Sequence, residues 1–306
     1  MFMTLMTAGF ITGMLGNVFI GLVNCYDWVK NHKVTFINFI LICLAVSRMS
    51  SLLVVFVDAI IWELAPHVYD SSSLAKCFDI LWIMTDQLSI WFATCLSIFY
   101  FLKIAHFSHP LFLWLKWRMR SMIVVFLAFS LFLLIFYFLL LGTLPIFMEI
   151  YMMAKSNQTL FSDTHETIAV KNLIVFHLTY LIPFLVSLVS LLLLFLSLVK
   201  HSRNCHLIST SSEDSRTKVH KKAMKMLLSF FILFIIHIFF FVQLTRWLFM
   251  FYPMNSSVNL VMLTLDIFPL SHLYILILGN SKLRQIAVRA LQHLKSQLQE
   301  ILQSFY

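Results

Sequence analysis

A carboxylate lies within a long apolar run, spaced so that an aromatic ring and a hydroxyl share its helix face. Steps of four, three and four residues separate Trp82, Asp86, Ser89 and Ala93. This spacing places all four on one face of a helix. The apolar run, residues 77–104, is long enough to cross a bilayer, where an ionisable side chain costs about 2.5–3.5 kcal/mol and normally faces the bundle interior. We therefore predict that Asp86 points inward, where it can pair with a cation.

Other apolar runs carry polar and aromatic residues with which such a site could be built. The candidates are Phe234, His237 and Phe241 on one face, Met262 and Asp266 one turn apart, and Asp58 near a run's outer end. Aromatic walls with a few polar groups are typical of small-molecule sites. The chain has no His-Glu-x-x-His motif and no clustered metal-ligand spacing, so we expect no enzyme activity, metal or cofactor.

The composition excludes soluble classes of protein. Hydrophobic residues make up 61% of the 306 residues and charged residues only 11%, against roughly 45–50% and about 25% in soluble domains. A soluble enzyme, a disordered chain and a repeat solenoid are therefore excluded. The apolar runs are continuous rather than alternating, which excludes a transmembrane barrel. The sequence predicts an all-α membrane protein, and its net charge of +9 indicates basic cytoplasmic loops, not nucleic-acid binding.

Seven apolar runs are long enough to span a bilayer. They cover residues 2–25, 37–62, 77–104, 122–148, 173–199, 223–250 and 258–278. All seven must be helices, because lipid cannot pair a backbone amide. No basic segment precedes the first run, so we interpret it as a spanning helix and not as a cleaved signal peptide.

Basic residues set the orientation. Of the 22 Lys and Arg residues, 17 lie in the odd-to-even loops and the tail, and Lys76, Lys155, Lys171 and Arg246 lie on the opposite side. The positive-inside rule then places the tail in the cytoplasm and the N-terminus outside the cell. The glycosylation acceptor at Asn157 falls in the longest outer loop, which agrees with this orientation, and we expect the chain in the plasma membrane.

The chain divides into a seven-span domain, 1–280, and a tail, 281–306. Apolar residues recur at helical spacing along the tail with Lys and Arg between them, which predicts an amphipathic helix on lipid of the inner leaflet. A frayed, partly helical tail is the alternative.

An odd number of spans and a basic inner surface favour a G-protein-coupled receptor, since a transporter usually has paired, Gly- or Pro-broken halves. Several motifs then carry a closer likeness. They are Gly16-Asn17-Val18-Phe19-Ile20-Gly21, Leu44-Ala45-Val46-Ser47-Arg48, Ser97-Ile98-Phe99-Tyr100-Phe101-Leu102-Lys103, Phe112-Leu113-Trp114-Leu115-Lys116-Trp117-Arg118 and, after His272, Ile275-Leu276-Ile277-Leu278-Gly279-Asn280-Ser281. Together they resemble the type 2 taste receptors, the bitter taste receptor family. Three features depart from that pattern: a shorter N-terminus, Leu273 where the family usually has Ser, and Asp86 where it commonly has Asn.

The resemblance implies roles for particular residues. Trp82 and Asp86 match agonist-contacting positions, His237 and Phe241 the pocket wall, and Phe234 the switch aromatic at its floor. The activation core would comprise Asn17, Arg48, Phe234, Pro269 and His272, with Arg48 linking the first, second and seventh helices. A purely structural network is the alternative. The surface toward the G protein would comprise Tyr100, Lys103, Lys116, Arg118, Lys221, Lys222 and Lys225, although these charges also suit a role in setting topology alone.

These features lead to one functional prediction. We expect a bitter taste receptor that binds small hydrophobic agonists and activates a heterotrimeric G protein of the gustducin or inhibitory type. If Asp86 is ionised, its carboxylate favours cationic amphiphiles, helped by cation–π attraction of about 0.5–2 kcal/mol. The alternative is that Asp86 pairs internally with His237 or is protonated through desolvation. A vomeronasal pheromone receptor and, from another class, a transporter remain the alternative functions.

Overall fold

The protein is helical throughout the part of the chain that the computed structural model describes. These residues are 2–31, 35–65, 72–105, 110–155, 180–197 and 254–304, with 225, 228–229, 231–233 and 235–236. The helices are α1 (Phe2–Asn31), α2 (Phe36–Leu64), α4 (Ser72–Ile104), α5 (Pro110–Trp117), α6 (Met119–Lys155), α10 (Met254–Gly279) and α11 (Ser281–Ser304), and a further helix covers Tyr180–Ser197.

Six helices among the described residues are long and apolar enough to cross a membrane. The 29 residues of α2, for example, extend about 44 Å at 1.5 Å per residue, more than the roughly 30 Å of a bilayer's hydrocarbon core. Six of the predicted spans are thereby confirmed, and α1, α2, α4, α6 and α10 extend beyond their predicted bounds at one or both ends. The other predicted span, 223–250, lies almost entirely outside the described residues.

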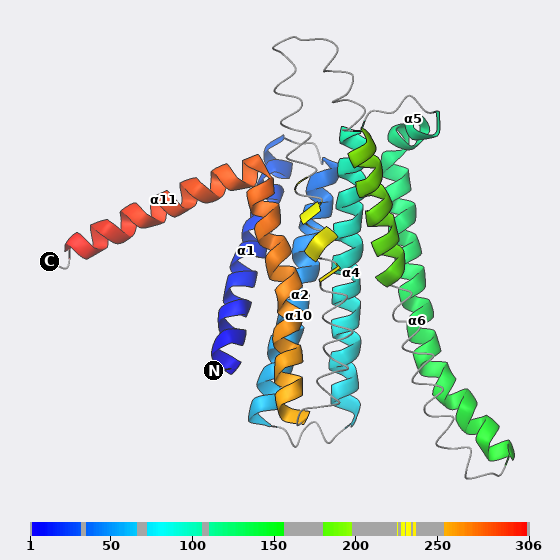
Figure 1. Ribbon diagram of the computed structural model, residues 1–306. Coiled ribbons are helices and arrows are strands. Elements are labelled where there is room, and N and C mark those ends of the chain that lie inside the picture. Colours follow the sequence, from blue (N-terminus) through cyan, green and yellow to red (C-terminus); the bar gives the residue numbers. More distant parts are fainter. Residues whose placement is uncertain are drawn as a thin grey trace.

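The spanning helices form a bundle in which α2 is central to the best-packed part. It packs against α1 on one side and α4 on the other, while α10 contacts α1 and α2 and α6 contacts α4. Figure 1 shows α6 running beside α4 at one end of the bundle and diverging from it at the other. Apolar side chains of α1, α2, α4 and α10 join in one core, to which Ile20, Leu44, Leu96 and Phe268 belong.

Glycines in α1 allow the close approach of its neighbours. A Cβ atom on Gly13 would lie 2.6 Å from Leu52 Cδ1 of α2, and one on Gly16 would come still closer to Leu273 Cδ2 of α10. Neither distance is compatible with van der Waals contact. The absence of a side chain at these positions therefore lets α1 lie against both helices, a packing mode typical of membrane bundles.

The short helix α5 was not predicted. It follows α4 and precedes α6, and one of its aromatic side chains, Phe112, is buried against Phe101 at a centroid distance of 5.6 Å. Leu191 and Leu194 of the helix Tyr180–Ser197 complete this small cluster. Eight residues are too few for a distinct periodic signal in the sequence, so α5 is specified mainly by the burial of Phe112.

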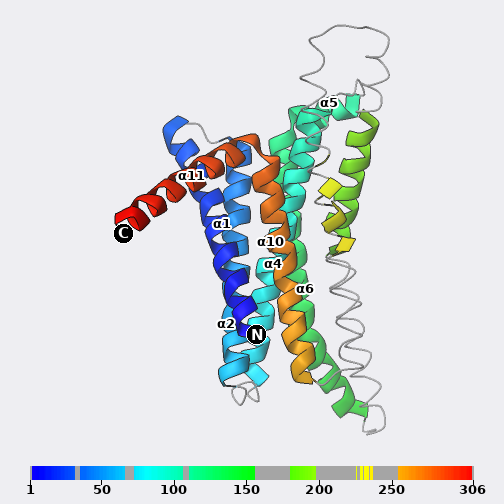
Figure 2. The same cartoon turned by 60° about the vertical axis from the view of Figure 1, so that its left-hand side comes forward.

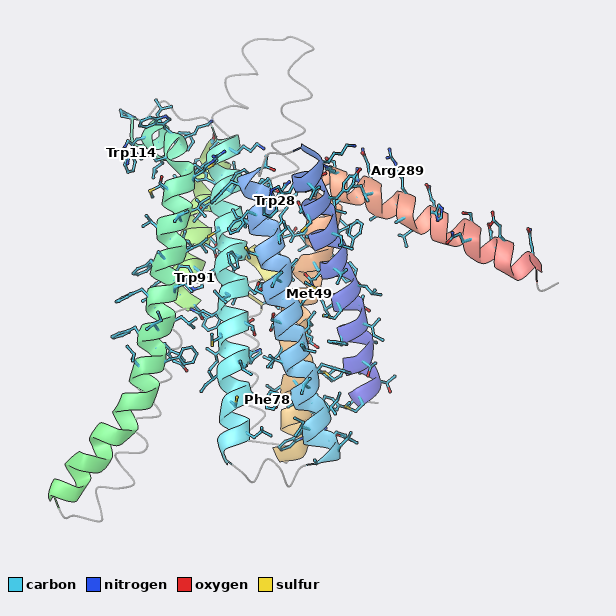
Figure 3. All side chains as sticks on the ribbon, turned by 180° about the vertical axis from the view of Figure 1, so that it is seen from behind. Trp28, Met49, Phe78, Trp91, Trp114 and Arg289 are labelled. Carbon is cyan, nitrogen blue, oxygen red and sulfur yellow. The ribbon has the colours of Figure 1, made fainter. Side chains whose placement is uncertain are left out.

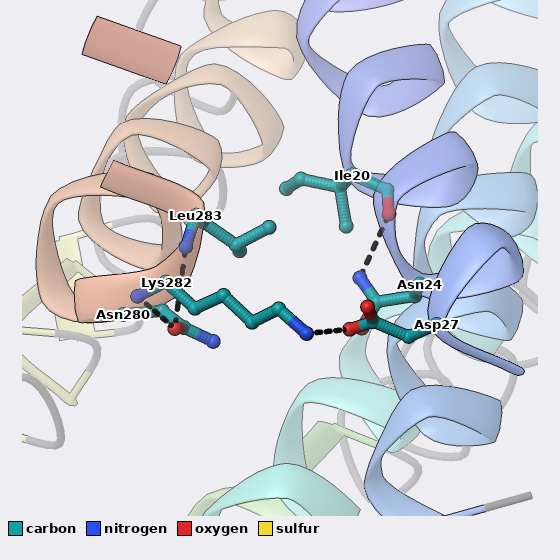
Figure 4. A network of polar contacts seen from close by, with 6 residues as sticks. All are labelled: Ile20, Asn24, Asp27, Asn280, Lys282 and Leu283. Atoms are coloured by element: carbon teal, nitrogen blue, oxygen red, sulfur yellow. Dashed lines mark hydrogen bonds and ion pairs between the residues drawn. The ribbon is translucent and has the colours of Figure 1, made fainter. Parts of the chain in front are cut away.

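The tail forms the single helix α11, which leaves the bundle at the end that also carries α5 (Figures 1 and 2). Asn280 caps it, because its side-chain Oδ1 accepts hydrogen bonds from the backbone amides of Lys282 at 3.0 Å and Leu283 at 3.4 Å. The Lys282 ammonium pairs with the Asp27 carboxylate at the end of α1, as Figure 4 shows. A continuous helix confirms the predicted fold of the tail and replaces the frayed alternative.

We predict that Gly16→Ala lowers the melting temperature of the purified chain, because the added methyl group overlaps Leu273. Overpacking of this kind costs about 1–3 kcal/mol. Gly21→Ala is the matched control, since its Cβ atom would meet only the Ala45 Cβ at 4.0 Å and alanine is the better helix former. The double variant Gly16→Ala with Leu273→Ser should recover much of the loss. Equal melting temperatures for the two glycine variants would contradict this packing.

Candidate functional site

The inward face predicted for the third span is confirmed. Asp86 is 3% exposed, Ser89 and Ala93 are also buried, and Trp82 is half-buried. One turn of helix separates each of these residues from the next, so α4 presents an aromatic ring, a carboxylate and a hydroxyl in sequence along its buried side. This arrangement can hold a ligand that carries both an apolar ring and a cationic or hydrogen-bonding group.

Tyr180 contacts the Asp86 carboxylate. The Tyr180 hydroxyl donates a hydrogen bond to Asp86 Oδ2 at 2.8 Å, and two turns further along Ser187 Oγ lies 3.3 Å from Thr94 Oγ1. These two bonds join the helix Tyr180–Ser197 to α4. Sequence analysis missed Tyr180. Its phenol hydroxyl lies within an apolar run and needs a hydrogen-bond partner when buried, which is the feature that could have identified it. His237, the partner weighed for Asp86 in the sequence, lies outside the described residues.

Trp82 borders an apolar cluster at the end of the bundle opposite α5 and α11. The cluster consists of Met6, Val55, Ala59 and Met262, from α1, α2 and α10, with Trp62 and Trp82 packed against it. Met262, predicted as a ligand contact, is therefore close to the helix face that carries Asp86. The cluster adds apolar side chains beside the helix face that carries Asp86.

The other two predicted carboxylates lie on α10 and α2 rather than on α4. Asp266 is buried where α10 packs against α1, since a Cβ atom on Gly9 would lie 3.7 Å from Asp266 Oδ2. Asp58 is half-buried on α2 beside Ala59, which belongs to the apolar cluster that Trp82 borders. The structure thus brings Trp82, Asp86 and Met262 toward one region and places Asp266 against the first helix.

The most deeply buried charge in the described part of the chain is Arg48, which is 0% exposed in the middle of α2. Its Nε donates a hydrogen bond to Ser89 Oγ of α4 at 3.3 Å, and its Nη2 contacts His272 Nδ1 of α10. An arginine in a membrane bundle retains its charge and needs such partners. Arg48 therefore ties three helices together at one level.

These contacts differ in part from the expected activation core. Among the described residues, the hydrogen bonds of Arg48 reach the third and seventh spans, and the expected link to the first span is not among them. Asn17 of α1 instead donates its side-chain amide to Gly13 O of its own helix at 2.8 Å. Ser89, expected to contact ligand, accepts the Arg48 hydrogen bond. Pro269 is buried inside α10, one turn before His272.

Some buried polar atoms near this level have no hydrogen-bond partner in the part of the chain that is described. They are Arg48 Nη1, Asn17 Oδ1 and, further along α4, Trp91 Nε1. Trp91 of α4 faces α6 (Figure 3), with its ring centroid 4.6 Å from that of Phe126 and the two ring planes tilted by 45°. A buried polar atom without a partner costs about 1–3 kcal/mol, so the polar layer around Arg48 is incompletely satisfied in this conformation.

The end of the bundle with α5 and α11 carries the basic residues expected to face the G protein. Lys103 and Arg118 are exposed, Tyr100 and Lys116 half-buried, and Lys225 exposed on a helical residue. Six predicted residues lie outside the described residues: Asn157, Lys221, Lys222, Phe234, His237 and Phe241. In the described residues, no group of three or more His, Cys, Asp and Glu side chains is placed to hold a metal ion.

Comparison with known proteins gives one consistent result. The family model described as Taste receptor protein (TAS2R) matches residues 1–295. Taste receptor type 2 member 42 of Pan troglodytes is 52% identical over 300 residues, which cover 96% of this chain and 94% of that protein. The human protein of the same name is 52% identical over 301 residues, with the same coverage. Taste receptor type 2 member 7 of Pongo pygmaeus is 40% identical over 299 residues, covering 92% and 89%.

We predict that His272→Phe lowers the stability of the purified chain by about 1–3 kcal/mol, because it leaves the buried Arg48 with one partner fewer. Ser271→Ala, at the neighbouring half-buried position, is the control. Thermal unfolding in detergent measures both. In a cycle with Arg48→Met, the double variant should lose less than the sum of the single losses. Additive losses would show that the two side chains do not interact.

Proposed function

Because the chain belongs to the Taste receptor protein (TAS2R) family and is a bitter taste receptor, we propose that its agonists are hydrophobic amines bound at Asp86. The chain is a multi-pass membrane receptor, a class whose partners are a ligand and a G protein. The observation that supports the proposal is the buried position of Asp86, hydrogen-bonded by Tyr180 and one turn from Trp82. A carboxylate there attracts an ammonium group, while the apolar cluster around Met262 accepts the hydrophobic part.

Binding of an amine exchanges one partner of Asp86 for another. The Tyr180 hydroxyl donates a hydrogen bond to Asp86 Oδ2. An ammonium group supplies a charge-assisted hydrogen bond, which is about twice as strong as a neutral one. Trp82 adds cation–π attraction when the ammonium lies over its ring. The interaction with Asp86 therefore stabilises the bound agonist, and it loosens the contact between α4 and the helix Tyr180–Ser197.

The same exchange affects Arg48, one turn deeper. Ser89 lies between the two charged groups along α4 and accepts the Arg48 Nε hydrogen bond, and the opposite charges of Asp86 and Arg48 attract each other. A cationic ligand at Asp86 offsets this attraction and weakens the tie between α2, α4 and α10. Agonist binding then shifts an existing equilibrium toward the conformation with the less tightly held polar layer. We infer that Arg48 and His272 act as the switch between the pocket and the inner face.

The signalling side of the proposal is the basic end of the bundle. Lys103, Lys116, Arg118 and, on the sixth span, Lys225 face the G protein, which we propose is of the gustducin or inhibitory type. This end then lies in the cytoplasm and the N-terminus outside the plasma membrane. The amphipathic helix α11 rests on the inner leaflet, held at its start by Lys282 and Asp27.

Calcium mobilisation in cells expressing this chain with a gustducin-like G protein tests the agonist site. Bitter cationic amphiphiles should give responses, and Asp86→Asn should raise their half-maximal concentrations about 10- to 100-fold, because a hydrogen bond to a charged group contributes about 1.5–3 kcal/mol. Surface expression is measured in parallel.

Two variants make that test specific. Glu63→Gln removes an exposed carboxylate near the C-terminal end of α2. This variant should leave amine responses unchanged. Tyr180→Phe removes the internal competitor for Asp86 and should lower the half-maximal concentration of amines roughly two- to tenfold. Full amine sensitivity in Asp86→Asn would disprove the carboxylate role, and responses to neutral compounds alone would remove the cation preference while leaving the receptor assignment intact.

The orientation has its own test. If the N-terminus lies outside the cell, Asn157→Gln should remove the mobility shift that a glycosidase produces on a gel. Asn255→Gln should leave that shift in place, because Asn255 lies in the first turn of α10, too close to the membrane for the glycosylation enzyme. If the chain without substitutions shows no mobility shift after glycosidase treatment, the proposed topology is contradicted.

A further inference from the structure

A basic elbow joins α5 to α6 at the end of the bundle that carries α11. We define it as residues 116–121, which line an open hollow of about 350 Å³. Its lining residues are Lys116, Trp117, Arg118, Met119, Arg120 and Ser121. We propose that this hollow binds the phosphate headgroup of an anionic phospholipid in the adjacent leaflet.

The charge of the elbow has no local counterpart. Between Asp86 and Glu149 the sequence contains no Asp or Glu. Among the described residues, no carboxylate forms an ion pair with Lys116, Arg118 or Arg120, whereas Lys282 at the same end of the bundle is paired with Asp27. Three cationic groups within five positions are therefore available to an anion from outside the chain. Arginine donates hydrogen bonds in the planar fork that suits phosphate oxygens.

The aromatic residues of the elbow point to a lipid rather than to soluble phosphate. Trp117 is 80% exposed and Trp114 is 46% exposed, which is unusual for such large apolar rings in contact with water. Tryptophan is enriched at membrane–water interfaces because its ring is apolar and its indole N–H is polar. The Arg118 guanidinium lies 5.9 Å from the Trp114 ring and 5.7 Å from the Trp117 ring. These rings hold the charge of Arg118 at the surface.

The fold holds the elbow rigidly at the edge of the bundle. Phe112 is buried under α5, Lys116 Nζ donates to Ala105 O at 3.5 Å, and the backbone amide of Met122 donates to Arg118 O at 3.0 Å. Figure 1 shows α5 beside α4 and α6, on the opposite side of the bundle from α11. If α11 rests on the leaflet surface, α5 meets the same surface on the opposite side of the bundle, with Trp114 and Trp117 outermost.

Binding of short-chain lipids to the purified full-length chain tests the site. The probe is fluorescent dioctanoyl-phosphatidylserine, measured by anisotropy, with dioctanoyl-phosphatidylcholine and inorganic phosphate as competitors. Phosphatidylserine should bind at least tenfold more tightly than either competitor. The double variant Arg118→Gln with Arg120→Gln should weaken phosphatidylserine binding about 25-fold, since one basic residue near an anionic surface changes the affinity roughly fivefold.

A matched variant separates a defined site from general surface charge. Arg289→Gln with Lys295→Gln removes two exposed charges from α11 and should weaken binding far less. Trp117→Ala keeps every charge and should still weaken binding several-fold. Equal losses from the elbow and α11 variants would overturn the proposal in favour of diffuse attraction. Unchanged lipid binding in the elbow variant, with loss of G-protein activation, would overturn it in favour of a protein-binding surface. The anisotropy measurements of lipid binding, with and without competitors, require no agonist.

Discussion

A guanidinium that cannot lose its charge lies in the middle of a bundle surrounded by lipid, and the packing of the described helices depends on giving it partners. Arg48 extends from α2 to a hydroxyl on α4 and to an imidazole on α10. Removing either partner would leave this buried charge with one hydrogen-bond partner fewer, which is costly in a protein interior. The constraint therefore fixes the relative height of three helices. The glycines of α1 then allow a fourth to close against α2 and α10.

The polar layer around Arg48 also connects the two ends of the molecule. Asp86 lies one turn from Ser89 and bonds to Tyr180, so a helix without a direct contact to Arg48 is coupled to it through α4. Below this layer, Ser187 and Thr94 repeat the contact between the same two helices. In the proposed mechanism, such a chain of contacts lets a ligand near Trp82 influence the end of the bundle that carries α5 and α11.

The basic end of the bundle combines two kinds of surface. At α11, the charge nearest the bundle is neutralised within the chain, because Lys282 pairs with Asp27 and Asn280 caps the helix. At the elbow between α5 and α6, the charges of Lys116, Arg118 and Arg120 face a hollow lined with no acidic residue. The first arrangement holds a helix in position, and the second leaves cationic groups available to a binding partner. The same positive charge thus serves structure on one side of the bundle and, as we propose, lipid binding on the other.

Hydropathy and charge determined the class of protein, six of the described spans, the amphipathic tail and the inward direction of Asp86. Each of these depends on local spacing or on the cost of a polar group in lipid, and both can be judged from one segment. Several motifs that occur in order along the sequence also indicated the family. The tertiary structure alone decided that Tyr180 satisfies Asp86, that Ser89 serves Arg48 and that Asp266 lies against Gly9. It also placed Phe112 in the core and so formed α5. Those contacts join residues on different helices, and the rotation of one helix against another depends on how all their side chains pack together, which no single segment specifies.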